Sequence, residues 1–240
     1  MKTRILGLAL AWATLAPITH AASLTIVNFD FETGGLTDGN FSGGTVPTGW
    51  SAIGSINSAA YGYFNPTVAT GGYVGTDGSP GVAGTMSGAN VFYFGTANTG
   101  EGIQQTLSAT FAANTDYTLT VAIGSRPSNS DNANLDMRLF AGTTLFASGT
   151  FRNTAFGTFA DFSLNYTANA THAALAGQAL KIQLIENDTG LNLGNELNLD
   201  IDNIRLDATA SAIPEPSTYT TIFGVLALGA AAFRRRQARA

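Results

Sequence analysis

Apolar and polar residues alternate with a period of two in several short stretches along the middle of the chain. Such a period places the apolar side chains on one face of a β-strand and the polar ones on the other. Clusters of Gly, Asn, Asp and Ser separate the stretches, and these residues favour turns. The pattern predicts antiparallel strands over residues 117–123, 135–139, 162–166, 180–184 and 197–201.

Two other segments complete the expected fold. Val91–Phe94 is apolar without alternation, which predicts a strand that is covered on both faces. Ala168–Gln178 is the only stretch of the body with a helical pattern, and we expect a short turn there. About ten strands in one body fit two packed sheets. We therefore predict an all-β fold, an antiparallel jelly-roll β-sandwich over residues 23–212, without an internal linker or repeat.

The first 22 residues have the composition of a secretory signal peptide. Lys2 and Arg4 precede an apolar run over residues 5–16, and the small residues Ala21 and Ala22 suit cleavage. The run is too short to span a bilayer. The sequence therefore predicts a cleaved signal helix over residues 1–22 and export across the inner membrane by the general secretion machinery.

The C-terminal end, residues 213–240, has three consecutive parts. Pro214, Glu215 and Pro216 come first, the uncharged segment Tyr219–Phe233 follows, and a basic cluster of Arg234, Arg235 and Arg236 comes last. Prolines interrupt a helix, so they separate the body from the apolar segment. That segment predicts a short helix of about 22 Å at roughly 1.5 Å per residue. This is shorter than the roughly 30 Å of bilayer hydrocarbon, so we expect a transient transmembrane anchor with its arginines in the cytoplasm.

These three parts together resemble the PEP-CTERM sorting signal of Gram-negative bacteria, which an exosortase recognises. The resemblance implies that exosortase is a partner and that the tail is removed near Pro214-Glu215-Pro216. It also implies delivery of the body to the cell surface or into the extracellular polysaccharide of a biofilm. An ordinary C-terminal membrane anchor is the alternative interpretation.

The body is acidic and sparsely charged. Between the two terminal segments lie five basic and fifteen acidic residues, a formal charge of −10. Nucleic acids need a basic surface for their phosphates, so this charge excludes nucleic-acid binding. The chain has no cysteine, which excludes disulfides and thiol catalysis. The packed core therefore has to stabilise the exported domain.

Three short segments resemble the galactose-binding-like jelly rolls of carbohydrate-binding modules. They are Asn28-Phe29-Asp30-Phe31-Glu32, Gly49-Trp50 and the final strand over residues 199–206. The resemblance implies a structural calcium ion held by Glu32 and Asp202, and no other cofactor is required. The apolar pattern also shifts between Ile201 and Ile204, which predicts a β-bulge at Asp202–Asn203. Two carboxylates alone are not a calcium site, and both acids as solvated residues at a strand edge are the alternative.

Aromatic residues gather in a glycine-rich segment at Tyr61, Tyr63 and Phe64. Rings exposed on loops there would stack on sugar faces and provide a carbohydrate-binding site. The alternative is that the same rings pack the loops onto the sandwich. We expect Trp50 to belong to the core.

The sequence contains none of the common catalytic motifs. After removal of the signal peptide His172 is the only histidine, and we expect it to be an ordinary turn residue. We therefore predict no catalytic residues and a non-catalytic protein of the cell surface or exopolysaccharide that binds carbohydrate. The alternatives are a structural matrix protein without a specific ligand and, since two carboxylates suffice for a glycosidase, a secreted glycoside-active enzyme.

Overall fold

The computed structural model describes residues 21–54, 61–67, 73, 85–95, 100–126, 133–187, 198–211, 223–229, 234–235 and 237–238. The residues of the body, 21–211, contact one another densely and form a unit distinct from the terminal segments 1–20 and 212–240. The body is built of β-strands, as predicted. The expected signal helix over residues 1–22 lies almost wholly outside the described residues.

Twelve strands and one short 3-10 helix make up the described body. They are β1 (Ala22–Leu24), β2 (Phe41–Gly43), β3 (Ser51–Ile53), β4 (Tyr61–Phe64), β5 (Val91–Phe94), β6 (Gly102–Thr110), β7 (Thr115–Ser125), β8 (Asn134–Ala141), β9 (Thr144–Phe151), β10 (Thr158–Tyr166), η1 (Ala170–Leu175), β11 (Ala179–Asn187) and β12 (Leu199–Ala210). All six predicted strands are present, and η1 occupies the one predicted turn.

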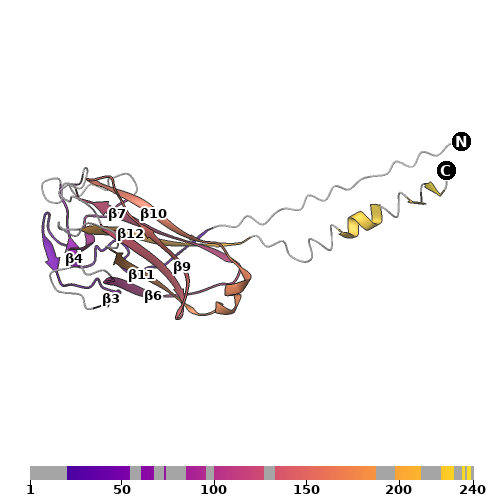
Figure 1. Cartoon of the computed structure of the whole chain (residues 1–240), viewed down its shortest axis with the longest axis horizontal. Helices are drawn as coiled ribbons and strands as arrows, with labels where there is room; N and C mark the ends of the chain where they lie inside the picture. Colours follow the sequence, from indigo (N-terminus) through magenta and orange to yellow (C-terminus); the bar gives the residue numbers. More distant parts are fainter. Residues whose placement is uncertain are drawn as a thin grey trace. The chain divides into compact units, whose positions relative to one another are not determined.

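The strands form two antiparallel sheets that face each other (Figure 1). The larger sheet has the order β10-β7-β12-β5-β4-β2, and β1 pairs with the far half of β12. The smaller sheet has the order β3-β6-β11-β8-β9. This arrangement confirms the predicted β-sandwich.

The core lies between the sheets and follows from the alternation in the sequence. Along β8, for example, Leu135, Met137 and Leu139 are fully buried while the residues between them are half-buried. Trp50 is buried in the same core, as predicted, and its Nε1 donates to the carbonyl oxygen of Val27 at 3.1 Å. In each such strand the two-residue period places the apolar side chains on the face that packs against the core.

Strand β6 is absent from the sequence-based prediction because a polar residue interrupts its apolar face. Gln105 points inward between Ile103 and Leu107 and is buried. Its side-chain amide accepts from the backbone N–H of Val27 at 2.8 Å and donates to the carbonyl oxygen of the same residue at 2.9 Å. These bonds satisfy the buried amide and attach the segment after β1 to the smaller sheet.

Strand β12 contains the predicted bulge. Its register against β7 shifts between Asp202 and Arg205, and Asn203 has a left-handed φ of 47°. Before the bulge β12 pairs with β5, and after it with β1. The backbone N–H of Ile204 donates instead to the carbonyl oxygen of Phe29 at 2.9 Å. The bulge therefore marks where one neighbouring strand replaces the other.

In the C-terminal segment residues 223–229 are helical and their side chains are exposed. No helix among the described residues is both long and apolar enough to cross a membrane, so the expected transmembrane helix is not supported. Arg234 and Arg235 are described, whereas Pro214, Glu215, Pro216 and Arg236 lie outside the described residues.

Candidate functional site

Two acidic residues of β12 project from the outer face of the larger sheet, away from the core. Ile201, between them, belongs to the core, so the two-residue period turns Asp200 and Asp202 outward together. Asp200 lies opposite Tyr93 of β5 and Gly124 of β7. Both carboxylates are nevertheless fully buried, because other side chains and segment 85–90 cover this part of the face.

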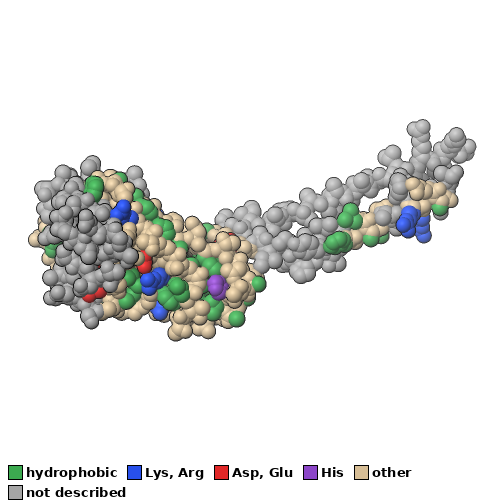
Figure 2. Space-filling model, viewed as in Figure 1, with side chains coloured by type: hydrophobic (Ala, Val, Ile, Leu, Met, Phe, Trp, Pro, Cys, Tyr) green, Lys and Arg blue, Asp and Glu red, His purple; other side chains and the backbone are tan. Residues whose placement is uncertain are grey.

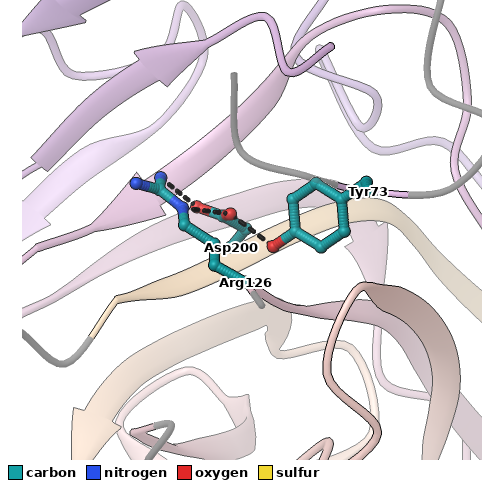
Figure 3. A network of polar contacts seen from close by, with 3 residues as sticks. All are labelled: Tyr73, Arg126 and Asp200. Atoms are coloured by element: carbon teal, nitrogen blue, oxygen red, sulfur yellow. Dashed lines mark hydrogen bonds and ion pairs between the residues drawn. The ribbon is translucent and has the colours of Figure 1, made fainter. Parts of the chain in front are cut away.

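Asp200 is the centre of a buried polar network with Arg126 and Tyr73 (Figure 3). Nε and Nη2 of Arg126 donate to its two carboxylate oxygens at 2.8 and 2.7 Å. The hydroxyl of Tyr73 donates to Oδ2 at 2.5 Å. A two-point guanidinium–carboxylate pair is among the strongest ionic hydrogen-bonding arrangements in proteins. It fixes the end of β7 and residue 73 to β12.

Arg126 and Tyr73 both have raised pKa values in this network. Burial alone would lower the pKa of Arg126, but the neighbouring carboxylate outweighs this effect and raises the pKa above its ordinary value. Burial, reinforced by the charge of Asp200, raises the pKa of Tyr73 well above its usual range. Arg126 and Tyr73 both donate to Asp200, so the acceptor oxygens of the network are already engaged.

Aromatic rings surround the guanidinium. Its carbon lies 4.6 Å from the ring centre of Phe64 and 5.6 Å from those of Phe41 and Tyr93. Phe64 and Tyr93 are buried, and Phe41 is exposed. Cations over aromatic faces are stabilised most when they are removed from water. These rings therefore help to hold the Arg126–Asp200 pair in place.

The three rings expected on exposed loops, Tyr61, Tyr63 and Phe64, instead lie in β4 and are buried. This is a correction to the expected exposure, and the packing alternative describes their position. Tyr61 and Tyr63 face the core, and Phe64 faces outward next to Arg126. The hydroxyl of Tyr61 donates to the carbonyl oxygen of Gly44 at 3.2 Å. Their place in β4, between β2 and β5, puts Tyr61 and Tyr63 into the core, and the glycine-rich local sequence did not indicate this strand.

Glu32 and Asp202, the two expected calcium ligands, both contact segment 85–90. Oε1 of Glu32 accepts from the backbone N–H groups of Ala89 and Asn90, each at 2.6 Å. Oδ2 of Asp202 accepts from the backbone N–H of Ser87 at 2.7 Å. Neither acid is a solvated strand-edge residue, because both are held by loop donors.

The other oxygen of Asp202, Oδ1, is buried and accepts no hydrogen bond from the part of the chain that the structure describes. Burial raises the pKa of Asp202 well above its ordinary value, and the charges of Glu32 and Asp30 add to this effect. Within the described ranges no three acidic or histidine side chains gather closely enough to hold a metal by themselves. A calcium ion there would need main-chain carbonyl oxygens as further ligands.

His172 lies in η1, in the turn where the sequence places it. Its Nδ1 lies 3.1 Å from the hydroxyl of Tyr166, and the side chain of Asn169 accepts from its backbone N–H. These contacts are those of a capped turn.

A separate hollow of about 340 Å³ lies beside β1 and is lined by Ile26, Phe29, Ile204 and Arg205 among others. It contains no acidic side chain of the network above.

The body matches the model of the HpiC1-like family, described as HpiC1 cyclase, over residues 22–207. The C-terminal end matches the PEP-CTERM protein-sorting motif over residues 212–237. The chain therefore belongs to the HpiC1-like family and ends in a PEP-CTERM motif, as the sequence predicted for its tail. It is an exported protein of the cell surface or extracellular space. No curated protein matches the chain.

Among solved structures the body is similar to cyclases from Fischerella sp. TAU. One is 25% identical, with a TM-score of 0.64, over 81% of this chain and 100% of that chain. The Stig cyclase Fisc, in complex with an indole compound, is 24% identical, with a TM-score of 0.63, over 80% and 100% of the two chains. A CBM4 module is a more distant neighbour, at 16% identity and a TM-score of 0.39 over 68% and 96% of the two chains. Membership of a family named for a cyclase leaves catalysis open.

Proposed function

We propose that the mature body is a non-catalytic carbohydrate-binding protein of the exopolysaccharide. On this proposal exosortase recognises the C-terminal signal, which inserts into the membrane transiently and is then removed. The sorting motif supports the destination. The observation that carries the non-catalytic part of the proposal is the Arg126–Asp200 pair, because it occupies the acceptors of a buried acid in a two-point ion pair.

A general acid or base has to exchange a proton with its substrate. Asp200 is poorly suited to this role, because Arg126 and Tyr73 already donate to its two oxygens. On the face shown in Figure 2, the basic and acidic side chains of the body are few and dispersed. Uncharged groups therefore predominate on the coloured part of this face, which suits hydrogen bonding to sugars.

The test is binding of the processed protein, as cells export it, to a glycan array and to soluble polysaccharides. Saturable binding that changes little with ionic strength supports the proposal. If the protein binds no polysaccharide and also stays with the matrix when cells are fractionated, the structural matrix role replaces it.

A cyclase-like activity is the second candidate function. Family membership favours it, and so does the buried carboxyl of Asp202, whose raised pKa suits a proton donor. A structure of a related cyclase contains 4-(1H-indol-3-yl)butan-2-one, and that compound is a suitable probe. If it raises the melting temperature of the parent, and Asp202→Asn removes turnover of an indole substrate while binding persists, the cyclase role is correct.

We also propose that Asp202 and Glu32 contribute to a structural calcium site. The buried Oδ1 of Asp202, which has no hydrogen-bond partner among the described residues, and the nearby acids Glu32 and Asp30 support it, because a divalent cation would balance this local negative charge. Bound calcium requires an ionised Asp202, whereas proton donation requires a protonated one. The calcium proposal and the cyclase proposal therefore make opposite demands on the same side chain.

A further inference from the structure

Phe41 is the exposed member of the aromatic group around Arg126. It is the first residue of β2, a three-residue strand at the edge of the larger sheet, and 49% of its surface is exposed. An apolar ring that is accessible to solvent gains free energy when a ligand covers it. An accessible ring that is also held in one orientation is therefore worth considering as a ligand platform.

Two neighbouring rings fix the orientation of Phe41. It pairs in register with Phe64, and the two rings stack with their centres 4.1 Å apart and their planes 1° from parallel. Tyr93 meets it edge-on at 5.8 Å. Since Phe64 covers one face, the exposed area belongs mainly to the opposite face. A ring already held in place loses little conformational entropy when a ligand binds.

Arg126 lies nearer to Phe64 than to Phe41 and is buried. Its Nε and Nη2 bind Asp200. Because the carboxylate balances the charge of the guanidinium, the platform carries no net positive charge. An uncharged apolar ring face matches the apolar C–H face of a sugar ring.

We propose that Phe41 forms a subsite for one neutral sugar ring of a polysaccharide, which stacks on the open face of the ring. This inference rests on the proposed carbohydrate-binding function and specifies its site and ligand class. Neutral polysaccharides are favoured over anionic ones for two reasons. The body has a formal charge of −10, and the one cation at the platform is already paired with Asp200.

The experiment compares three variants of the processed protein by gel retardation in a neutral galactomannan, a neutral β-glucan and anionic alginate. Phe41→Ala removes the platform, and Phe41→Trp preserves a stacking surface. Phe156→Ala is the matched control, because Phe156 is similarly exposed, at 47%, but lies outside this aromatic group. We expect affinity for a neutral polysaccharide to fall about tenfold in Phe41→Ala and to be retained in the other two variants. Unchanged melting temperatures establish that the variants are folded.

The outcomes separate this inference from the function on which it rests. If the parent binds a neutral polysaccharide and Phe41→Ala binds it equally well, the protein binds carbohydrate elsewhere and the subsite is wrong. If the parent binds only alginate, the ligand class is wrong. If it binds none of the three and no glycan on an array, the carbohydrate-binding function fails and the subsite with it.

Discussion

Arg126 and Asp200 lie 74 residues apart in the sequence and form a two-point ion pair with nitrogen–oxygen distances of 2.7 and 2.8 Å. The pair joins the end of β7 to the start of β12 on the outer face of the larger sheet. Tyr73 donates to the same carboxylate, so three distant parts of the chain meet at one buried charge.

Removal of Arg126 should destabilise the body strongly. Arg126→Ala leaves the Asp200 carboxylate buried and unpaired, and breaking a buried ion pair in this way costs about 3–5 kcal/mol. The free energy of unfolding in urea measures the effect.

The control is Arg138→Ala, because Arg138 pairs with Asp136 at 2.9 Å on the partly exposed outer face of the smaller sheet. Exposed pairs contribute about 0–1 kcal/mol. If the two variants lose similar stability, the buried network does not have the role assigned to it here.

Gly124 should not tolerate a side chain. A Cβ at this position would lie 2.5 Å from Cζ of Phe159 and 2.6 Å from the hydroxyl of Tyr73. Gly124→Ala therefore has to displace Tyr73 or Phe159, at a cost of about 1–3 kcal/mol for an overpacked site.

Gly95→Ala is a matched control, because the nearest atom to a Cβ there is at an ordinary contact distance of 3.5 Å. Thermal unfolding of both variants measures the difference. Equal melting temperatures would show that Tyr73 and Phe159 move aside at little cost in stability.

Asp136 should make the body less stable in acid. Burial would raise the pKa of its carboxyl, but hydrogen bonds from Thr150 and Asn187 and the contact with Arg138 outweigh burial and lower the pKa. A carboxyl with a lowered folded pKa stabilises the fold above its unfolded value and loses that contribution as the pH falls through the folded value.

Thr150→Val removes the hydroxyl that donates to Asp136 at 2.6 Å. We expect Thr150→Val to lower the urea midpoint at pH 7 and to have a smaller effect once the carboxyl is protonated at low pH. An effect of equal size at both pH values would contradict this assignment.

Removal of divalent cations tests whether a calcium ion binds at Asp202. If the ion is present, EDTA lowers the melting temperature of the parent, and Asp202→Asn is less stable and insensitive to EDTA. If it is absent, EDTA has no effect and Asp202→Asn is more stable at pH 7, because a neutral amide avoids the cost of burying a carboxyl group that is ionised in the unfolded chain.

The C-terminal signal should determine where the protein is found. Deletion of residues 212–240, the segment that contains the sorting motif, should leave the body in the soluble periplasmic fraction and absent from the cell surface. A variant with Arg234, Arg235 and Arg236 replaced by Gln should accumulate unprocessed at its full length. Immunoblots of cell fractions measure both results, and normal processing of the Gln variant would show that exosortase does not need the arginines.

Local patterns predicted the fold class and six of the twelve strands, because strand formation depends on alternation within a few residues. β7, β8 and β11 each bury alternate apolar side chains. β6 was missed because Gln105 occupies an inward position, where its amide is satisfied by the backbone of Val27, 78 residues away. A buried polar residue whose partner is distant in the sequence interrupts the apolar alternation, although the strand still forms.

The site was less predictable than the fold for a similar reason. Glu32 and Asp202 were singled out from motif resemblance, and the structure places both against segment 85–90. Arg126 and Tyr73 were missed, because their partner lies 74 and 127 residues away and no short pattern marks either of them. Phe41 was missed because its exposure depends on the pairing of β2 with β4, which a sequence does not show.

The pairing of β1 with β12 determines where the two ends of the body lie. Ala22 lies directly opposite Ala208 in neighbouring strands, so the first and last residues of the body are close together. Domains with adjacent ends commonly tolerate circular permutation. A short linker between Ser211 and Ala22, with new ends opened in the turn between β8 and β9, should give a circular permutant that keeps both sheets intact.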